Sequence, residues 1–330
     1  MQTLSGGIVY LPVGGDVVVN PGGFGIPGAT LSGNLGLDSG PHHITVGQNL
    51  VASGGPQCII SATIGETSGG GSLEKDGPGR LVLTGNNTYS GVTTVAGGWL
   101  QVDGSQPGSG VLVNSGGTLR GTGTVGYIQL ADGSTVAPGD SPGILNCGLV
   151  EGPSSGAATL QIELDGTTPG SGYSQLNAHG LFVSLSGIRL SASLNYASAV
   201  GDQFEIVNYG VPNPIIGTFN GLPQNGTLYI GSELFQISYT GGTGNDVVLS
   251  RQVTPPPPVL TIQTPTNSVL LSWQTNDPLF ALEFSTDLNP TNWLPVTPLP
   301  VIIGTNNVVT NSAGGPQKFY RLNRPAIPGN

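Results

Sequence analysis

Charged residues are scarce in this chain, and their scarcity excludes several kinds of protein. Lys and Arg number 8 and Asp and Glu number 18 among 330 residues, so 8% are charged, against about 25% in an ordinary domain. The net charge of −10 argues against nucleic acid and anionic membrane surfaces as partners, because both require clustered basic residues. Disorder is disfavoured too, since 37% of the residues are apolar and the charge is sparse.

Cysteines and long apolar runs are also few. Cys58 and Cys147 allow one disulfide at most and belong to no metal-binding spacing, so we expect two small buried residues. No apolar run approaches the ~18 residues of a membrane helix. The first residues lack the basic and apolar segments of a signal peptide. If the protein is exported, we expect Met1 to be the start of a fragment.

Glycine and proline are abundant instead, with 56 and 27 copies. Long helices are therefore disfavoured, and collagen is excluded because the glycines have no three-residue period. Short β-prone runs recur between glycine-rich turns, for example at 81–84, 92–95, 100–102 and 111–113. Such short strands, without one large hydrophobic block, favour an all-β solenoid in which each coil buries its side chains on the next. We expect about 20 residues in each coil.

One segment carries a specific motif. Residues 71–104 read GSLEKDGPGRLVLTGNNTYSGVTTVAGGWLQVDG. This segment strongly resembles the autotransporter-associated β-strand repeat, whose pattern is L-x-K-x-G-x-G-x-L-x-L-x-G-x-N-x-Y-S-G-x-T-x-V-x-x-G-x-L-x-V. The resemblance implies a right-handed parallel β-helix over roughly 43–250 in a secreted or cell-surface protein. We therefore predict a β-helix over 1–251, with less regular first coils and a closing hairpin.

A second region follows a proline-rich spacer. Residues 252–258 read QVTPPPP, which favours a stiff linker. Residues 259–330 carry three acids and three bases, whereas residues 1–250 carry 15 acids and 4 bases. Residues 259–325 resemble the small fibronectin-III-like modules of secreted bacterial proteins. This resemblance implies a small β-sandwich with Trp273 and Trp293 inside, and we expect it to fold independently.

Candidate catalytic residues are weak. The histidines His42, His43 and His179 lie in no catalytic motif, and we interpret them as surface or turn residues. Two carboxylates two apart on a strand share one face, so Glu163 and Asp165 are the only pair that we consider for a polysaccharide-cleaving site. A solvated strand face explains that pair better. Lys75 and Arg80 flank a turn, and we expect both to be solvated.

Two further sets of residues are candidate binding sites. Residues 241–249, GGTGNDVVL, fit the calcium-binding nonapeptide once, but that site needs consecutive copies. We therefore expect a glycine-rich hairpin and no metal, with Asp246 as the ligand in the alternative. In the tail, Trp273, Trp293 and Tyr320 are candidate sugar-stacking residues, although aromatic side chains in so small a sandwich usually fill its core.

The sequence thus favours a structural or adhesive function without a cofactor. The predicted protein is a non-catalytic, secreted or cell-surface β-helical stalk with a terminal attachment module. The alternative is a polysaccharide-binding or polysaccharide-cleaving β-helix with an acidic groove. A cell-surface or environmental glycan is the expected partner, and exposed solenoid ends also allow end-to-end self-association.

Overall fold

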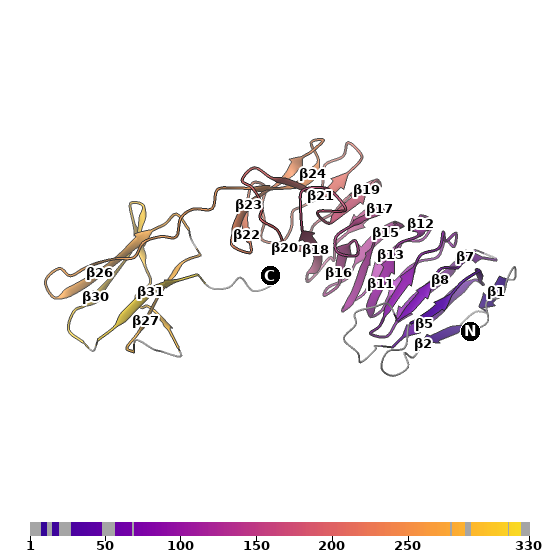
Figure 1. Cartoon of the computed structure of the whole chain (residues 1–330), viewed down its shortest axis with the longest axis horizontal. Coiled ribbons are helices and arrows are strands. Elements are labelled where there is room, and N and C mark those ends of the chain that lie inside the picture. The colour runs from indigo at the N-terminus through magenta and orange to yellow at the C-terminus, as the bar shows by residue number, and fades with distance from the viewer. Residues whose placement is uncertain are drawn as a thin grey trace. The chain divides into compact units, whose positions relative to one another are not determined.

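The computed structural model describes residues 8–11, 15–19, 28–47, 57–67, 69–277, 279–287, 292–315 and 317–324. The chain divides into two compact units, Met1–Gln252 and Val253–Gly329. Both units consist of β-strands and turns (Figure 1). Across the described residues, no helix has the length and apolar character needed to cross a membrane.

Three sheets, mostly parallel, build the first unit (Figure 1). The shortest sheet has the order β1-β4-β7, with the strands Ile8–Leu11, Asn34–Leu37 and Thr63–Glu66. The second sheet has the order β20-β18-β16-β14-β11-β9-β6-β3. Its strands, in that order, are Ile188–Leu194, Ala158–Leu164, Thr135–Pro138, Gly117–Gly121, Gly98–Val102, Arg80–Leu83, Cys58–Ile60 and Ala29–Leu31.

The longest sheet has 13 strands in the order β2-β5-β8-β10-β13-β15-β17-β19-β21-β24-β23-β22, with β12 paired to β15 beside this path. The strands from β2 to β21 are Asp16–Val19, Gly40–Val46, Gly71–Asp76, Thr93–Val95, Val111–Val113, Thr124–Leu130, Ile144–Glu151, Gln175–Ala178 and Gln203–Tyr209. The remaining strands are β24 (Asp246–Arg251), β23 (Glu233–Gly241), β22 (Thr227–Ile230) and β12 (Ser105–Gln106). Stacked parallel strands of this kind confirm the predicted β-helix architecture.

The coils are less uniform than the expected 20 residues. Val111 in β13 pairs with Ile128 in β15, 17 positions further on. Ala178 in β19 pairs with Tyr209 in β21, 31 positions further on. The longer coils contain extra turns outside the strands, which the parallel ladder tolerates because only the strands must stay in register.

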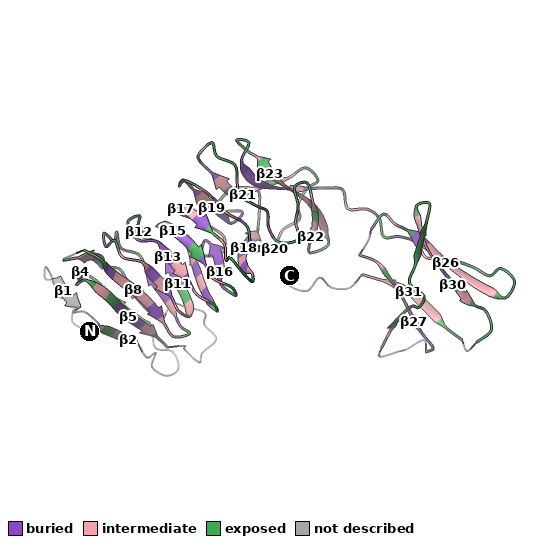
Figure 2. Ribbon diagram, turned by 180° about the vertical axis from the view of Figure 1, so that it is seen from behind, coloured by how far each residue is buried: buried purple, intermediate pink, exposed green. Residues whose placement is uncertain are grey.

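Alternation of side chains along each strand creates one continuous core (Figure 2). In β18, Ala158, Leu160, Ile162 and Leu164 are buried, and the residues between them face outward. Equivalent aliphatic side chains stack on every coil, so each coil supplies the apolar surface that covers its neighbour. Cys58 and Cys147 are free and buried, which confirms the expectation of two small core residues.

Two sequence expectations about charged or ionisable residues were wrong. Lys75 is 1% exposed, not solvated. Its Nζ donates to the carbonyl oxygens of Asp76 (2.9 Å), Gly77 (2.7 Å) and Gly97 (3.0 Å). His42 is also fully buried, with its ring Nδ1 3.3 Å from the carbonyl oxygen of Ser72. Both side chains point inward because they alternate with outward-facing residues on β8 and β5.

The other polar residues of the repeat also close its turns. The Asn87 side-chain oxygen accepts from the backbone N–H of Ile64 on the preceding coil, at 2.9 Å. The buried Tyr89 hydroxyl lies 2.6 Å from the hydroxyl oxygen of Thr93. A buried polar group needs such a partner. This need explains why the repeat pattern has polar residues at the positions of Asn87 and Tyr89.

An antiparallel hairpin follows the last parallel strands of the 13-stranded sheet. Strands β23 and β24 pair antiparallel around the turn between Gly241 and Asp246. Strand β24 in turn pairs antiparallel with β21, the last strand of the parallel ladder. Figure 1 shows these strands at the end of the coil stack. The last parallel strand of the 13-stranded sheet is therefore covered by the protein's own backbone.

The second unit contains two small antiparallel sheets, β25-β26-β30-β29 and β28-β27-β31. Their strands are β25 (Thr261–Gln263), β26 (Ser268–Gln274), β27 (Ala281–Ser285), β28 (Leu294–Pro295), β29 (Val301–Ile303), β30 (Asn306–Ser312) and β31 (Phe319–Asn323). Leu271, Trp273, Leu282, Val296 and Val309 form one small core. Side chains from both sheets contribute to this core.

Candidate functional site

Parallel pairing aligns seven outward-facing residues across the 13-stranded sheet, one from each of seven successive strands. In order along the sheet, they are Asp16, His43, Glu74, Thr94, Leu112, Gln129 and Glu151. We call this alignment the outer row. Each residue is partly or fully exposed, and neighbouring strands in a sheet are about 4.8 Å apart. The outer row therefore presents polar groups at a regular spacing.

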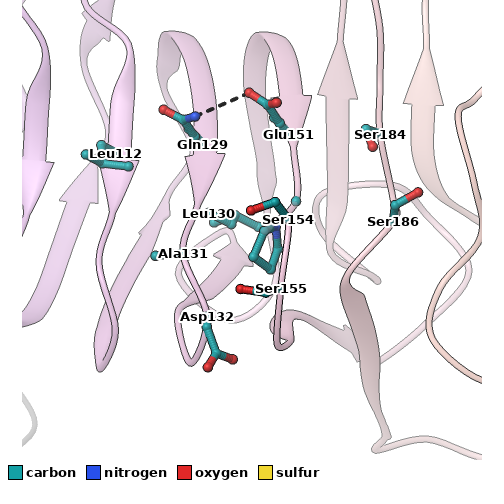
Figure 3. A pocket seen from close by; sticks show the side chains of 12 residues that line it. Leu112, Gln129, Leu130, Ala131, Asp132, Glu151, Ser154, Ser155, Ser184 and Ser186 are labelled. Atoms are coloured by element: carbon teal, nitrogen blue, oxygen red, sulfur yellow. Dashed lines mark hydrogen bonds between the residues drawn. The ribbon is translucent and has the colours of Figure 1, made fainter.

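A groove opens at the Glu151 end of the outer row (Figure 3). Its volume is about 540 Å³. The polar lining consists of Gln129, Asp132, Glu151, Ser154, Ser155, Ser184 and Ser186, and the apolar lining includes Leu112, Leu130 and Pro153. Figure 3 shows Glu151 and Asp132 toward opposite ends of the groove. We call this site the serine groove.

The two carboxylates of the serine groove have different environments. The Gln129 side-chain amide donates to Glu151 Oε2 at 3.3 Å, as the dashed line in Figure 3 shows. Asp132 Oδ1 accepts from the backbone N–H of Ala157 at 2.7 Å and so fixes a turn. Serine hydroxyls both donate and accept hydrogen bonds. The groove can thus bind a ligand rich in hydroxyl groups.

The structure places the predicted acid pair elsewhere. Glu163 lies on β18 in the eight-stranded sheet, where its Oε2 accepts from the Ser141 hydroxyl at 2.5 Å. Asp165 follows the end of β18, and its Oδ1 accepts from the Asn195 amide at 2.7 Å. Neither residue lines the serine groove. Sequence reasoning missed Glu151 and Asp132 because 19 positions separate them and no short motif joins them.

The predicted calcium residue has protein partners. Asp246 is fully buried at the start of β24. Its Oδ1 accepts from the backbone N–H of Tyr209 at 2.7 Å, and its Oδ2 accepts from the N–H and hydroxyl of Thr243 at 2.6 and 2.9 Å. Burial, together with the charge of Asp246, raises the pKa of the neighbouring Glu205 carboxyl. The carboxylate of Asp246 thus stabilises the closing hairpin through three donors.

The tail's aromatic candidates occupy three different environments. Trp273 is 2% exposed and lies in the tail core, out of reach of a surface ligand. The Arg321 guanidinium lies 4.3 Å from the centre of the Trp293 ring. Tyr320 packs beside the core, and its hydroxyl accepts from the Asn311 amide at 3.3 Å. The structure does not bring these three side chains into one binding platform.

An exposed aromatic residue of the solenoid was also missed. Trp99 on β11 is 43% exposed, and the Arg120 guanidinium lies 5.2 Å from its ring centre. Trp99 pairs with Arg80 on one side and Thr118 on the other. Arg80 was expected to be solvated. Instead its guanidinium Nη2 lies 2.7 Å from Asp140 Oδ1 in an ion pair, so the expectation is only partly met. The outward position of Trp99 could be deduced from its alternation with the core residue Leu100.

The stacked parallel sheets and their continuous core define a β-solenoid. Residues 73–102 match the passenger-associated-transport-repeat family. This match covers the segment in which Lys75, Asn87 and Tyr89 close the turns, so the chain carries an autotransporter passenger region. The repeat places the chain outside the cell or at the cell surface.

Two relatives are similar to about a third of this chain. The adhesin BmaC autotransporter of Brucella suis biovar 1 (strain 1330) is 44% identical over 108 residues, which is 31% of this chain and 3% of that protein. An extracellular serine protease of Serratia marcescens is 42% identical over 106 residues, which is 30% of this chain and 10% of the protease. The chain therefore matches only a small part of either relative, and one relative is an adhesin while the other is an enzyme.

Proposed function

We propose that this chain is a non-catalytic adhesive solenoid that binds a glycan in the serine groove. The observation that carries this proposal is the groove itself, in which four serines, Gln129 and Glu151 surround a volume of about 540 Å³. Small-molecule sites commonly combine apolar walls with a few polar groups that fix orientation. The similarity to the Brucella adhesin supports the adhesive part of the proposal.

The groove's chemistry favours a neutral or amino-bearing sugar. Leu112, Leu130 and Pro153 offer apolar surface to the C–H faces of a sugar ring, while the serines and Gln129 exchange hydrogen bonds with its hydroxyls. Glu151 and Asp132 make the groove acidic. Uronic acids and sulfated sugars would be repelled by these carboxylates.

Polysaccharide cleavage is the second candidate function. Glycosidases use two carboxyl groups on either side of the scissile bond, and Glu151 and Asp132 line the same groove. The Ala157 backbone N–H donates to one Asp132 oxygen, so this carboxylate already holds a turn in place. This structural role of Asp132 favours sugar binding over sugar cleavage. The similarity to an extracellular protease of Serratia keeps an enzymatic role open to test.

One experiment tests both functions. The full chain is screened against neutral, amino-bearing and acidic polysaccharides for binding and for release of reducing ends. We expect binding of a neutral or amino sugar that Glu151→Gln weakens about tenfold, as loss of one charged hydrogen bond implies. Glu163→Gln is the matched control and should leave binding unchanged. Turnover that either substitution abolishes would overturn the non-catalytic proposal.

We also propose that the tail unit is an attachment module. Three consecutive exposed apolar residues lie on the edge strand β29, where Val301, Ile302 and Ile303 are 65, 69 and 63% exposed. An exposed apolar edge strand is suited to pairing with another chain. A surface pull-down that Ile302→Lys leaves unchanged would argue against this use of β29.

A further inference from the structure

Three side chains with metal-binding atoms converge at the other end of the outer row. His43 in β5 pairs directly with Glu74 in β8. Asp76 lies two positions after Glu74 and so faces the same side of the sheet. His43 Nδ1 is 3.0 Å from Asp76 Oδ2 and 3.8 Å from Glu74 Oε2. One ligand atom from each residue lies within 4.8 Å of the others.

This geometry is close to that of a metal site. Zinc binds imidazole nitrogen and carboxylate oxygen at about 2.0–2.2 Å in tetrahedral geometry, so neighbouring ligand atoms are about 3.3–3.6 Å apart. The two measured separations bracket that range. The third separation, between the Glu74 and Asp76 carboxylates, is within 4.8 Å, so side-chain movements of up to about 1 Å would close the cluster around one ion.

We propose that His43, Glu74 and Asp76 form a surface site for a divalent transition cation of the zinc class. The imidazole nitrogen favours zinc over calcium or magnesium, which prefer oxygen ligands alone. The three side chains are 32–37% exposed, so the remaining coordination position is open to water or to a ligand atom from a partner. Catalytic zinc sites share this pattern of three protein ligands and one open position.

Two features of the fold hold these ligands in place. Parallel pairing fixes β5 against β8 over six residue pairs, from Gly40–Gly71 to Thr45–Asp76. Inward-facing His42 and Lys75 are buried on the same two strands, which prevents either strand from rotating its outward side chains away. Asp16 pairs with His43 from the other side and adds a third negative charge beside the cation.

The site is separable from the fold and from glycan binding. Glu74 and Asp76 occupy variable positions of the repeat pattern, between the inward Leu73, Lys75 and Gly77. The serine groove, whose lining begins at Leu112, lies at the far end of the outer row, beyond Thr94. Loss of the metal site should therefore leave glycan binding intact. A bound ion would link two coils that are 31 positions apart, since His43 and Glu74 lie on different strands.

The test uses the full chain after chelation and dialysis. Cobalt(II) serves as a spectroscopic probe, and zinc is then added to displace it. We expect one equivalent of cobalt with the absorption of a low-coordinate site, displacement by one equivalent of zinc, and a higher melting temperature with zinc. His43→Ala should weaken zinc binding about a hundredfold or more, because loss of even an outer-sphere partner costs 10–100-fold.

His179→Ala is the matched control, because His179 is an exposed histidine away from the cluster. This variant should bind zinc like the unchanged protein. Asp76→Asn is a second variant for the case in which His43→Ala does not fold, and it should also weaken binding. The proposal is overturned if the unchanged chain takes up no cobalt or zinc, or if His43→Ala and Asp76→Asn bind both ions normally. Such results would leave the cluster as an ordinary histidine–carboxylate ion pair.

Discussion

Replacement of Lys75 by methionine tests whether buried charge holds the repeat together. Methionine has a similar length but no donor, so the carbonyl oxygens of Asp76, Gly77 and Gly97 would lose their contacts with Nζ. A buried acceptor left without a partner costs about 1–3 kcal/mol. For three acceptors, with some relaxation and water entry, we expect Lys75→Met to lower the free energy of unfolding by about 3–5 kcal/mol at pH 7.

The same residue gives a pH dependence with a definite sign. Burial lowers the pKa of Lys75 from 10.5 to about 8. Between these values the unfolded chain binds more protons than the folded chain, so the stability contributed by this group rises with pH. From pH 8 to pH 9 the gain is about 1 kcal/mol. Above pH 9 the buried thiols act oppositely, since burial raises the pKa of Cys58 to about 11.

The assay is urea unfolding of the full chain at pH 7, 8 and 9, followed by circular dichroism, with hydrogen exchange of β8 and β10 as a local measurement. Subtraction of the Lys75→Met curve isolates the lysine from the thiols. Thr94→Met, at an outward-facing position on β10, is the control for the methionine side chain and should change little. Equal stability of Lys75→Met and Thr94→Met, or a difference that does not vary with pH, would refute this reasoning.

Four further substitutions test the turns and the closing hairpin. A Cβ at Gly104 would overlap a backbone carbonyl oxygen of the preceding coil, so Gly104→Ala should lower the free energy of unfolding in urea by about 3 kcal/mol. A Cβ at Gly116 would meet open space, but its φ of +76° disfavours alanine. Gly116→Ala should therefore lower the free energy of unfolding by about 1 kcal/mol. Tyr89→Phe removes a buried hydroxyl from its partners and should cost about 1–2 kcal/mol, with unchanged stability as the contrary result. Asp246→Asn should lower the free energy of unfolding by about 2 kcal/mol. If Asp246 binds no calcium, neither calcium nor a chelator should shift the melting temperature through this residue. A calcium-dependent melting temperature that Asp246→Asn abolishes would show a calcium site.

Much of the fold could be predicted because the repeat encodes local structure. The short apolar runs that contain Leu81, Leu83 and Val95 predicted strands, and the resemblance to the repeat implied that these strands stack in parallel. All three residues lie in the core. The glycine-rich segment before Asp246 predicted a hairpin turn, and β23 and β24 pair antiparallel on either side of it. The fibronectin-III-like character of the tail stays a prediction.

Both errors about buried polar residues had the same cause. The prediction used the usual exposure of lysine and histidine and ignored the position of each residue along its strand. Lys75 has the same parity as Leu73 on one strand, and His42 has the same parity as Ile44 and Val46 on another. Because alternate residues of a strand face the same side, the sequence itself placed both inside. Lysine is usually exposed and histidine is often partly so. Alternation along the strand outweighs this tendency where backbone carbonyl oxygens accept hydrogen bonds from the buried side chain, as they do from Lys75.

The serine groove and the metal cluster required a different kind of information. Each depends on which residue of one coil lies beside which residue of the next, and the coil length varies from 17 to 31 positions. His43 meets Glu74 across a 31-residue coil, whereas Gln129 meets Glu151 across 22 positions. No fixed period in the sequence relates these pairs. In a solenoid the inward pattern repeats because the core must be filled, while turn lengths are free to vary. Variation in turn length therefore assembles outward sites without altering the core, which is how one conserved architecture can present different surfaces.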